Sequence, residues 1–249
     1  MITVTTPIAR AFAVPHTRSA DLLLAVLGGL AIGVLAQISV PMWPVPVTGQ
    51  TLGVLAVAAA LGPRRGTFAV LAYLAQGAAG MPVFAGGTAG PAVLVGPTGG
   101  YLVGFVPAAL LVGAWFEHRS TARRTPATPA GVHVPAYARA YATADALLTA
   151  GVLAAATLVV YASGTVWLSR FVGWDRVVAL GIAPFLVGDA LKIALVALAA
   201  SAALAVGAPR EGPFHQPGGS SAICGASSGT GGASSRTVTV SAPSDALSS

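Results

Sequence analysis

The chain has 249 residues, of which 55% are hydrophobic and only 8% are charged. Since a soluble domain carries roughly a quarter charged residues, this composition excludes an ordinary soluble protein and indicates one that resides in a membrane. The net charge of +6 does not indicate nucleic-acid binding, because the basic residues are scattered through short polar segments and are not gathered on one face.

A membrane-spanning helix needs about 20 predominantly apolar residues, and the apolar runs of this chain predict six spans. In chain order they cover residues 21–40, 50–61, 66–80, 99–116, 142–163 and 182–206. The second is the shortest and ends at Gly62-Pro63. Residues 1–20 precede the spans, and residues 208–249 form a Gly/Ser-rich tail whose composition predicts disorder. We therefore expect an all-α membrane protein with a six-helix bundle in residues 21–207.

Two connections between these spans, residues 41–49 and 81–97, carry no charged side chain. Both are rich in proline or glycine, which disfavours a continuous helix. Non-helical backbone at membrane depth is tolerated only where it is buried in protein or lines a cavity. The two connections are thus candidates for a binding region, and ordinary external loops are the alternative. The connection at 117–139 is a polar, Arg-rich linker.

The distribution of basic residues predicts the orientation of the bundle, because cytoplasmic segments carry an excess of Lys and Arg. With the N-terminus inside, ten of the 13 basic residues fall on the inner side and two, Arg170 and Arg176, on the outer side. The remaining one, Lys192, lies within the sixth span. We expect both termini to be cytoplasmic in a multi-pass cell-membrane protein, with the two uncharged connections at the outer face.

Two charged residues, Asp189 and Lys192, interrupt the sixth span near its predicted outer end. Positions three apart share one face of a helix. Ionisable groups within a span are costly, face the bundle interior or a water-filled cavity, and mark functional sites. The pair predicts a polar ligand site. A structural ion pair and a proton pathway are the alternatives, and buried pairs by themselves are weak evidence for stability.

Other side chains near this region are candidate ligand contacts. Glycine lets a ligand approach the backbone closely, and the exposed amides of such a segment serve as donors. The candidates are Gln50, at the start of the second helix, and Phe84, Gly86, Gly87, Thr98 and Tyr101, in and after the glycine-rich connection.

The first span carries small residues at strict four-residue spacing, Ala25, Gly29 and Gly33. Small residues so spaced let another helix approach closely. That helix belongs either to this bundle or to another protein.

The sequence contains no pattern typical of an enzyme active site or of a metal site. The phosphate-binding loop requires Gly-x-x-x-x-Gly-Lys, and the sole lysine follows Ala190-Leu191. Outside the sixth span, the spans hold carboxylates only at helix ends, so paired acid–base catalysis is not expected. The single cysteine and the four histidines show no ligand spacing. We expect no enzyme activity, no metal and no cofactor, and any ATP hydrolysis would occur in a partner.

Four segments resemble the BioY family, the biotin-specific substrate-binding subunits (S components) of energy-coupling factor (ECF) transporters. They are PVPVTGQTL at 44–52, GMPVFAGG at 80–87, GPTGGYLVGF at 96–105 and PFLVGDALK at 184–192, in the family's order and spacing. The resemblance implies a six-helix membrane bundle that binds biotin near its outer face. It also implies a transmembrane coupling subunit and two cytoplasmic ATPase subunits as partners, with Ala25, Gly29 and Gly33 at the coupling-subunit interface.

Biotin offers two ureido N–H donors, a ureido carbonyl, an apolar body and a carboxylate. The resemblance leads to the hypothesis that Asp189 accepts from the ureido N–H groups, as a two-oxygen acceptor can. Lys192 then donates either to the ureido carbonyl or to the carboxylate, and backbone amides near Gly86, Gly87 and Thr98 supply further donors. An S component for another small vitamin and a channel or proton pathway are the competing functions.

Overall fold

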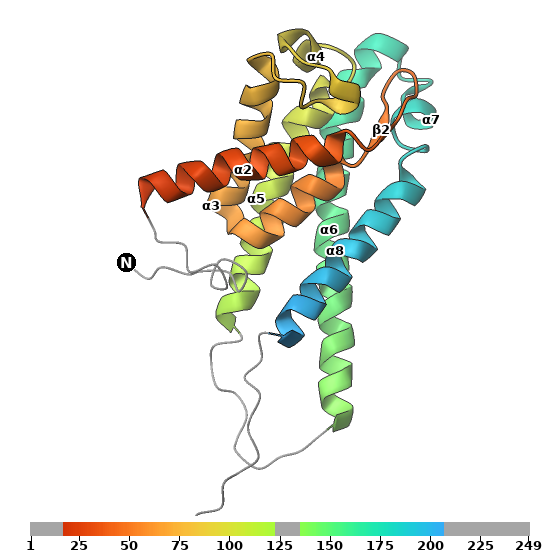
Figure 1. Cartoon of the computed structure of the whole chain (residues 1–249). Helices are drawn as coiled ribbons and strands as arrows, with labels where there is room; N and C mark the ends of the chain where they lie inside the picture. Colours follow the sequence, from red (N-terminus) through yellow and green to blue (C-terminus); the bar gives the residue numbers. More distant parts are fainter. Residues whose placement is uncertain (1–16, 123–134, 207–249) are drawn as a thin grey trace, which may run out of the picture. The chain divides into compact units, whose positions relative to one another are not determined.

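The structure, a computed structural model, describes residues 17–122 and 135–206. Apart from one short hairpin the described chain is helical, which confirms the predicted all-α class (Figure 1). The elements are α2 (Arg18–Ala36), β1 (Ser39–Val40), β2 (Val47–Thr48), α3 (Gln50–Ala78), η1 (Ala85–Gly87), α4 (Pro91–Val95), α5 (Gly99–Ala122), α6 (Pro135–Val172), α7 (Val177–Gly181) and α8 (Leu186–Val206). The predicted disordered tail and most of the N-terminal segment lie outside the described residues.

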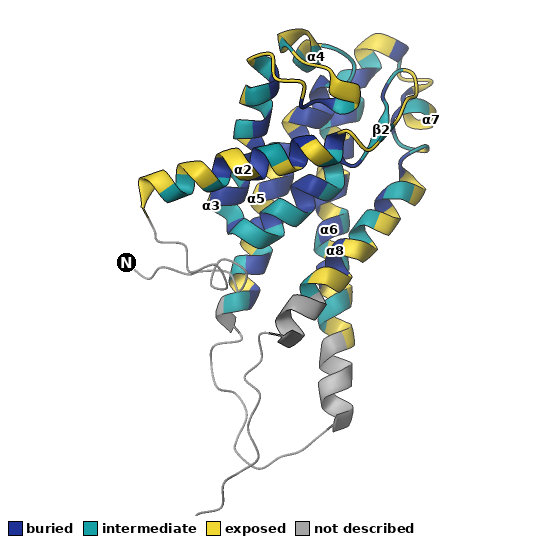
Figure 2. Ribbon diagram, viewed as in Figure 1, coloured by how far each residue is buried: buried dark blue, intermediate teal, exposed yellow. Residues whose placement is uncertain are grey.

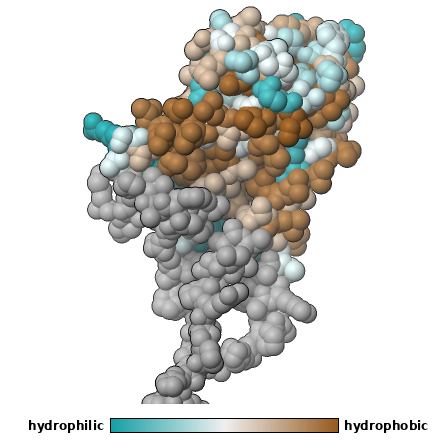
Figure 3. Space-filling view, viewed as in Figure 1, coloured by the Kyte–Doolittle hydropathy of each residue, from teal (hydrophilic) through white to brown (hydrophobic). Residues whose placement is uncertain are grey.

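Five helical stretches of the described residues are long and apolar enough to cross a membrane. Four belong to α2, α3, α5 and α6, and the fifth, Val177–Ala200, contains α7 and most of α8. Apolar side chains cover the visible surface of α2 and α8, whereas more polar ones gather over the end that carries α4 (Figure 3). Both findings support a multi-pass membrane protein.

The second and third predicted spans form the two arms of α3, which folds back on itself. Gly62 has φ 81° and ψ −178°, a conformation available essentially to glycine alone. Pro63 follows and has no N–H with which to continue the helix. Gln50 at one end donates a hydrogen bond to the Tyr73 hydroxyl, although a straight helix would separate them by about 35 Å. Because α3 is a helical hairpin, six predicted spans correspond to five long helices.

Several predicted helix boundaries were wrong. The first predicted span continued to residue 40, but α2 ends at Ala36 and Ser39–Val40 form β1. The polar linker expected at 117–139 is shorter, because α5 continues to Ala122 and α6 begins at Pro135. Glu, Arg and Ala are good helix formers, so both helices extend beyond their apolar stretches. α6 also continues past residue 163 to Val172. The predicted sixth span, 182–206, begins too early, since residues 182–185 form turns between α7 and α8 and the helix begins at Leu186.

The small residues of α2 pack inside the chain. A Cβ on Gly29 would lie 2.8 Å from the Tyr73 amide nitrogen, and one on Gly33 would lie 3.0 Å from Val83 Cβ. Ala25 is buried as well. Close packing within this bundle, one of the two interpretations of the stripe, is therefore what the structure contains. The outward face of α2 carries large exposed side chains, including Leu22, Leu23, Leu27 and Val34 (Figure 2).

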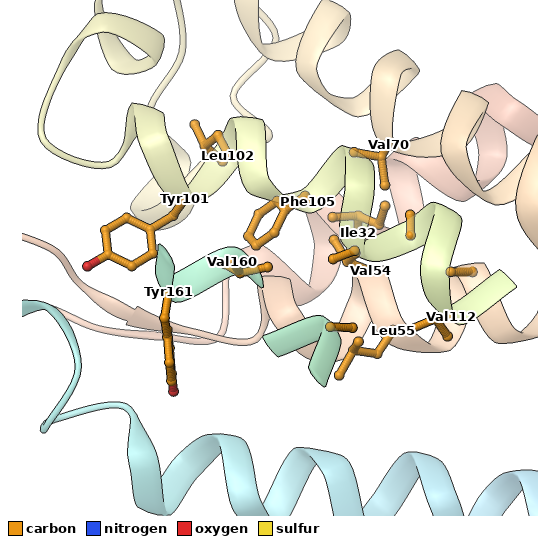
Figure 4. Close-up of a cluster of buried hydrophobic side chains, with 14 of the residues drawn as sticks. Ile32, Val54, Leu55, Val70, Tyr101, Leu102, Phe105, Val112, Val160 and Tyr161 are labelled. Atoms are coloured by element: carbon orange, nitrogen blue, oxygen red, sulfur yellow. The ribbon is translucent and has the colours of Figure 1, made fainter. Parts of the chain in front are cut away.

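One hydrophobic core joins α2, α3, α5 and α6. Branched and aromatic side chains from these helices interlock at its centre, including Ile32, Val54, Leu55, Val70, Phe105 and Val112 (Figure 4). This core holds the helix ends together at the end of the molecule where the β1–β2 hairpin, α4 and α7 also gather (Figure 1).

Candidate ligand-binding site

A cavity of about 240 Å³ opens at this end of the bundle. Segments far apart in the sequence surround it. Its lining residues are Val45, Pro46, Thr48, Gln50, Thr51, Phe84, Ala85, Thr88, Val93, Thr98, Tyr101, Leu102, Phe105, Val160, Tyr161, Phe185, Asp189 and Lys192. Asp189 is only 4% exposed, whereas Thr88 is exposed to solvent. The cavity is therefore buried and polar near Asp189, and it reaches the solvent-exposed surface near Thr88.

Asp189 lies in the first turn of α8 and is surrounded by donors from three helices. Its Oδ1 accepts from Lys192 Nζ at 2.7 Å and from the Thr51 hydroxyl at 3.1 Å. Its Oδ2 accepts from the Tyr161 hydroxyl at 2.5 Å. Hydrogen bonds to a carboxylate are shorter and stronger than those between neutral groups, so this network fixes the Asp189 side chain in the cavity wall.

Lys192 connects α8 to the start of α3. Its ammonium donates to the Thr48 carbonyl at 2.7 Å, to the Thr51 hydroxyl at 2.8 Å and to Asp189 Oδ1 at 2.7 Å. An ammonium has three N–H donors, and these three bonds use all of them. The lysine thus neutralises Asp189 and ties the helix to the β1–β2 hairpin.

A second polar chain begins at Gln50. Its amide nitrogen donates to the Tyr73 hydroxyl, and its oxygen accepts from the Thr48 hydroxyl at 3.0 Å. The Tyr73 ring meets Phe84 edge-on, with centroids 5.4 Å apart. Phe84 is 1% exposed and fills space left by the absent side chain of Gly77. Contacts with two residues of α3, Tyr73 and Gly77, therefore fix the position of Phe84 in the cavity wall.

Aromatic rings form the apolar wall. Phe185 lies between Tyr101 and Tyr161, with centroid distances of 6.1 and 6.5 Å. The Tyr101 hydroxyl donates to the Gly181 carbonyl at 2.8 Å, so this residue presents its ring and not its polar end to the cavity. Figure 4 shows Tyr101 and Tyr161 beside Leu102 and Phe105. The arrangement suits a compact apolar body attached to a hydrogen-bonding head.

The structure brings most of the predicted site residues together. Those that line the cavity are Gln50, Phe84, Thr98, Tyr101, Asp189 and Lys192. Gly86 and Gly87 do not line it; they form the exposed turn of η1, with φ values of 64° and 71°. Their neighbours Ala85 and Thr88 line it instead. Thr98 uses its hydroxyl to donate to the Val93 carbonyl at 3.3 Å.

Sequence reasoning missed Thr51 and Tyr161, the two hydroxyls that complete the Asp189 network. Thr51 directly follows Gln50, and this position next to a candidate ligand contact could have indicated its role. Tyr161 lies in an apolar stretch of α6, where a buried tyrosine hydroxyl needs a partner. Within residues 17–122 and 135–206, no three His, Cys, Asp or Glu side chains come together as metal ligands.

Comparison with known proteins identifies what this chain resembles. A family model described as "BioY family" matches residues 9–208. "Biotin transporter BioY2" of Lactococcus lactis is 35% identical over 185 residues, covering 74% of this chain and 89% of the relative. "Probable biotin transporter BioY" of Pyrococcus horikoshii is 34% identical over 165 residues, covering 66% and 84%.

The fold has a counterpart among solved structures. The crystal structure of "the S-component for biotin from an ECF-type ABC transporter" matches with a TM-score of 0.57 at 23% identity. The match covers 76% of this chain and 94% of that one. It shows that the two chains share a fold.

Proposed function

We propose that this chain, which belongs to the BioY family, is a membrane subunit that binds biotin at the outer end of its helices for uptake. One observation carries the proposal. The cavity combines a buried carboxylate, Asp189, with an apolar wall of aromatic rings. A carboxylate is a natural acceptor for the two ureido N–H groups, and the rings suit the bicycle and the valeryl chain.

Delivery of biotin inward would require a partner module, a transmembrane coupling subunit with two ATPase subunits. The absence of a phosphate-binding loop sequence from this chain supports the assignment of ATP hydrolysis to a partner. The distribution of arginines supports cytoplasmic termini, with the cavity facing outward. Ala25, Gly29 and Gly33 are all buried within the chain, so their contact with the coupling subunit would require α2 to move; Gly29 would have to leave α3, and Gly33 would have to leave Val83.

Equilibrium binding to the purified, detergent-solubilised chain tests the proposal. Isothermal titration calorimetry with biotin should give saturable binding at one site, whereas thiamine and riboflavin should give none. Binding of thiamine or riboflavin instead of biotin would establish an S component for another vitamin. Binding of none of the three by folded protein would refute the proposal.

Asp189→Asn tests the central residue. The change retains the shape of the side chain but removes the charge, and hydrogen bonds to charged groups contribute about 1.5–3 kcal/mol. We expect biotin affinity to fall roughly 10- to 100-fold, since about 1.4 kcal/mol corresponds to tenfold. Asp145→Asn is the matched control, because Asp145 also pairs with a buried cation, Arg119, but does not line the cavity. Equal effects of the two changes would contradict the assignment.

A further inference from the structure

We propose that the chain carries a second binding site, for an anionic phospholipid, where the first turn of α2 meets the bend of α3. Two arginines, Arg18 and Arg64, bind the phosphate, and apolar side chains that follow them on the two helices contact the acyl chains. In the proposed orientation this site belongs to the inner leaflet. The inference goes beyond the proposed function, because neither arginine lines the cavity.

An ion pair brings the two arginines to the same part of the surface. Asp21, in the first turn of α2, accepts a hydrogen bond from Arg65 Nε at 2.7 Å, and Arg65 Nη2 lies 2.5 Å from the same oxygen. Arg64 directly precedes Arg65, and Arg18 lies about one helical turn before Asp21. Because this pair joins the two helix ends, Arg18 and Arg64 lie on either side of it.

The positive charge of this region is not balanced by the residues that the structure describes. Arg65 neutralises Asp21. The side chains of Arg18 and Arg64 are exposed, and neither has a hydrogen bond or ion pair with another residue of 17–122 or 135–206. Two cationic side chains are therefore available to an anion.

The positions of these arginines do not serve helix stability. Arg18 is the first residue of α2, and Arg64 is the second residue of the α3 arm that begins at Pro63, after the bend at Gly62. The N-terminal end of a helix carries partial positive charge, which disfavours cations in the first turn. An anion between the two side chains removes this conflict, because the arginines and the helix ends then stabilise it together.

An exposed apolar stripe continues from each arginine. Residues four apart share one face of a helix. Leu22 follows Arg18 at this spacing, and Phe68 follows Arg64, with Leu71 one turn further along; all three apolar side chains are exposed. Figure 3 shows hydrophilic surface at the N-terminal end of α2 beside the apolar surface of the rest of the helix.

The two stripes belong to one pair of packed helices. A Cβ on Gly29 of α2 would lie 2.8 Å from the Tyr73 amide nitrogen, and Gln76 Nε2 donates to the Val26 carbonyl at 3.2 Å. α2 therefore packs along the second arm of α3, with both arginines at the same end of this helix pair.

This layout matches a phospholipid better than a soluble anion. The guanidinium group offers paired N–H donors to phosphate oxygens, and basic side chains at the cytoplasmic surface attract anionic lipids. Acyl chains that extend from the phosphate into the bilayer run along the apolar stripes. A soluble phosphate compound would contact the arginines alone and leave the stripes unused.

Native mass spectrometry of the purified, detergent-solubilised chain tests the lipid class. Phosphatidylglycerol should bind at least fivefold more tightly than phosphatidylcholine with the same acyl chains, since each arginine contributes about fivefold. Glycerol 3-phosphate at equal concentration should not displace phosphatidylglycerol. Equal binding of the two lipids would overturn the inference, and so would displacement by glycerol 3-phosphate, which would indicate a site for soluble anions.

A double variant tests the two arginines. Arg18→Gln combined with Arg64→Gln should weaken phosphatidylglycerol binding roughly 10- to 25-fold and leave phosphatidylcholine binding unchanged. Arg170→Gln combined with Arg176→Gln is the matched control, because it removes the same charge at two other exposed arginines and should change lipid affinity less than twofold.

Unchanged phosphatidylglycerol binding in the Arg18/Arg64 variant would overturn the assignment, as would an equal loss in the control. A cooperative thermal unfolding transition shows that each variant is folded. The lipid comparison on the wild-type chain decides the matter if a variant does not fold. All of these measurements omit biotin, so their outcome is separate from that of the proposed function.

Discussion

At the scale of single residues, Asp189 is held by hydrogen-bond donors from three separate parts of the chain. Lys192 lies on the same helix, but Thr51 is 138 residues away and Tyr161 is 28 residues away. The three groups satisfy a carboxylate that is nearly inaccessible to water, and a buried charge without such partners is strongly destabilising. Removal of one donor leaves the other two in place, so the protein should still fold, with reduced stability and with weaker ligand binding.

Tyr161→Phe provides that test. The phenyl ring fills the same space, while Asp189 Oδ2 loses its 2.5 Å hydrogen bond. We expect biotin affinity to fall about 5- to 20-fold in calorimetry, and the thermal unfolding transition in detergent to stay cooperative with a lower midpoint, because Asp189 Oδ2 loses its donor. Tyr101→Phe is the control, because its hydroxyl bonds to Gly181 outside the Asp189 network, and it should change affinity less than threefold. Wild-type affinity in Tyr161→Phe would contradict the role assigned to this hydroxyl.

At the scale of elements, the bend at Gly62 divides α3 into two arms, and the second arm folds back toward the first. It brings Gln50 to Tyr73 and thereby links the cavity to the opposite arm. Gly113 of α5 packs directly against Pro63 at the bend, with a space too small for a Cβ. The bend is thus fixed both by its backbone conformation and by the helix packed against it.

Gly62→Ala should destabilise the folded protein. At φ 81° and ψ −178° a Cβ is strained, at a cost of about 1–3 kcal/mol. The adjacent change Pro63→Ala should lower the free energy of unfolding by less than about 1 kcal/mol, because its main effect is to raise the conformational entropy of the unfolded chain. Thermal unfolding in detergent should show a clearly lower midpoint for Gly62→Ala than for Pro63→Ala. If the two midpoints agree, proline and not glycine determines the bend.

At the scale of the whole molecule, the two ends of the bundle differ in their charges. The cavity end contains the neutral pair Asp189–Lys192. Away from the cavity, Arg65 pairs with Asp21 and joins α2 to the bend of α3, and Arg119 pairs with Asp145 and joins α5 to α6. Arg170 and Arg176 belong to the outer side as well, but ten of the 13 basic residues of the sequence fall on the inner side in the proposed orientation, and this excess supports a cavity that faces outward.

Cysteine labelling in intact cells tests that orientation. In a chain with Cys224→Ser, Thr88→Cys should react with a membrane-impermeant maleimide, because Thr88 is exposed at the cavity edge. Arg64→Cys, exposed at the α3 bend, should react only after the cells are opened. Biotin should protect Thr88→Cys from labelling and leave Arg64→Cys unaffected. The reverse accessibility would mean that the cavity faces inward.

Local sequence determined the class of the protein and the centre of its candidate site. Apolar runs of span length predict membrane helices because composition alone decides whether a helix is stable in a bilayer. The three-residue spacing of Asp189 and Lys192 predicts a shared face because helix geometry is local. The observed ion pair at 2.7 Å agrees with this geometry. Gly62-Pro63 likewise marked the bend of α3.

Tertiary structure decided which distant residues share the cavity and which small residues are already used for packing. Thr51 and Tyr161 join Asp189 because the start of α3 and the middle of α6 pack beside α8. Gly86 and Gly87 do not line the cavity, although their neighbours Ala85 and Thr88 do. In the α2 stripe, Gly29 packs on α3 and Gly33 packs on Val83. These facts depend on contacts between segments far apart in the chain, and no local periodicity encodes the relative rotation of two helices.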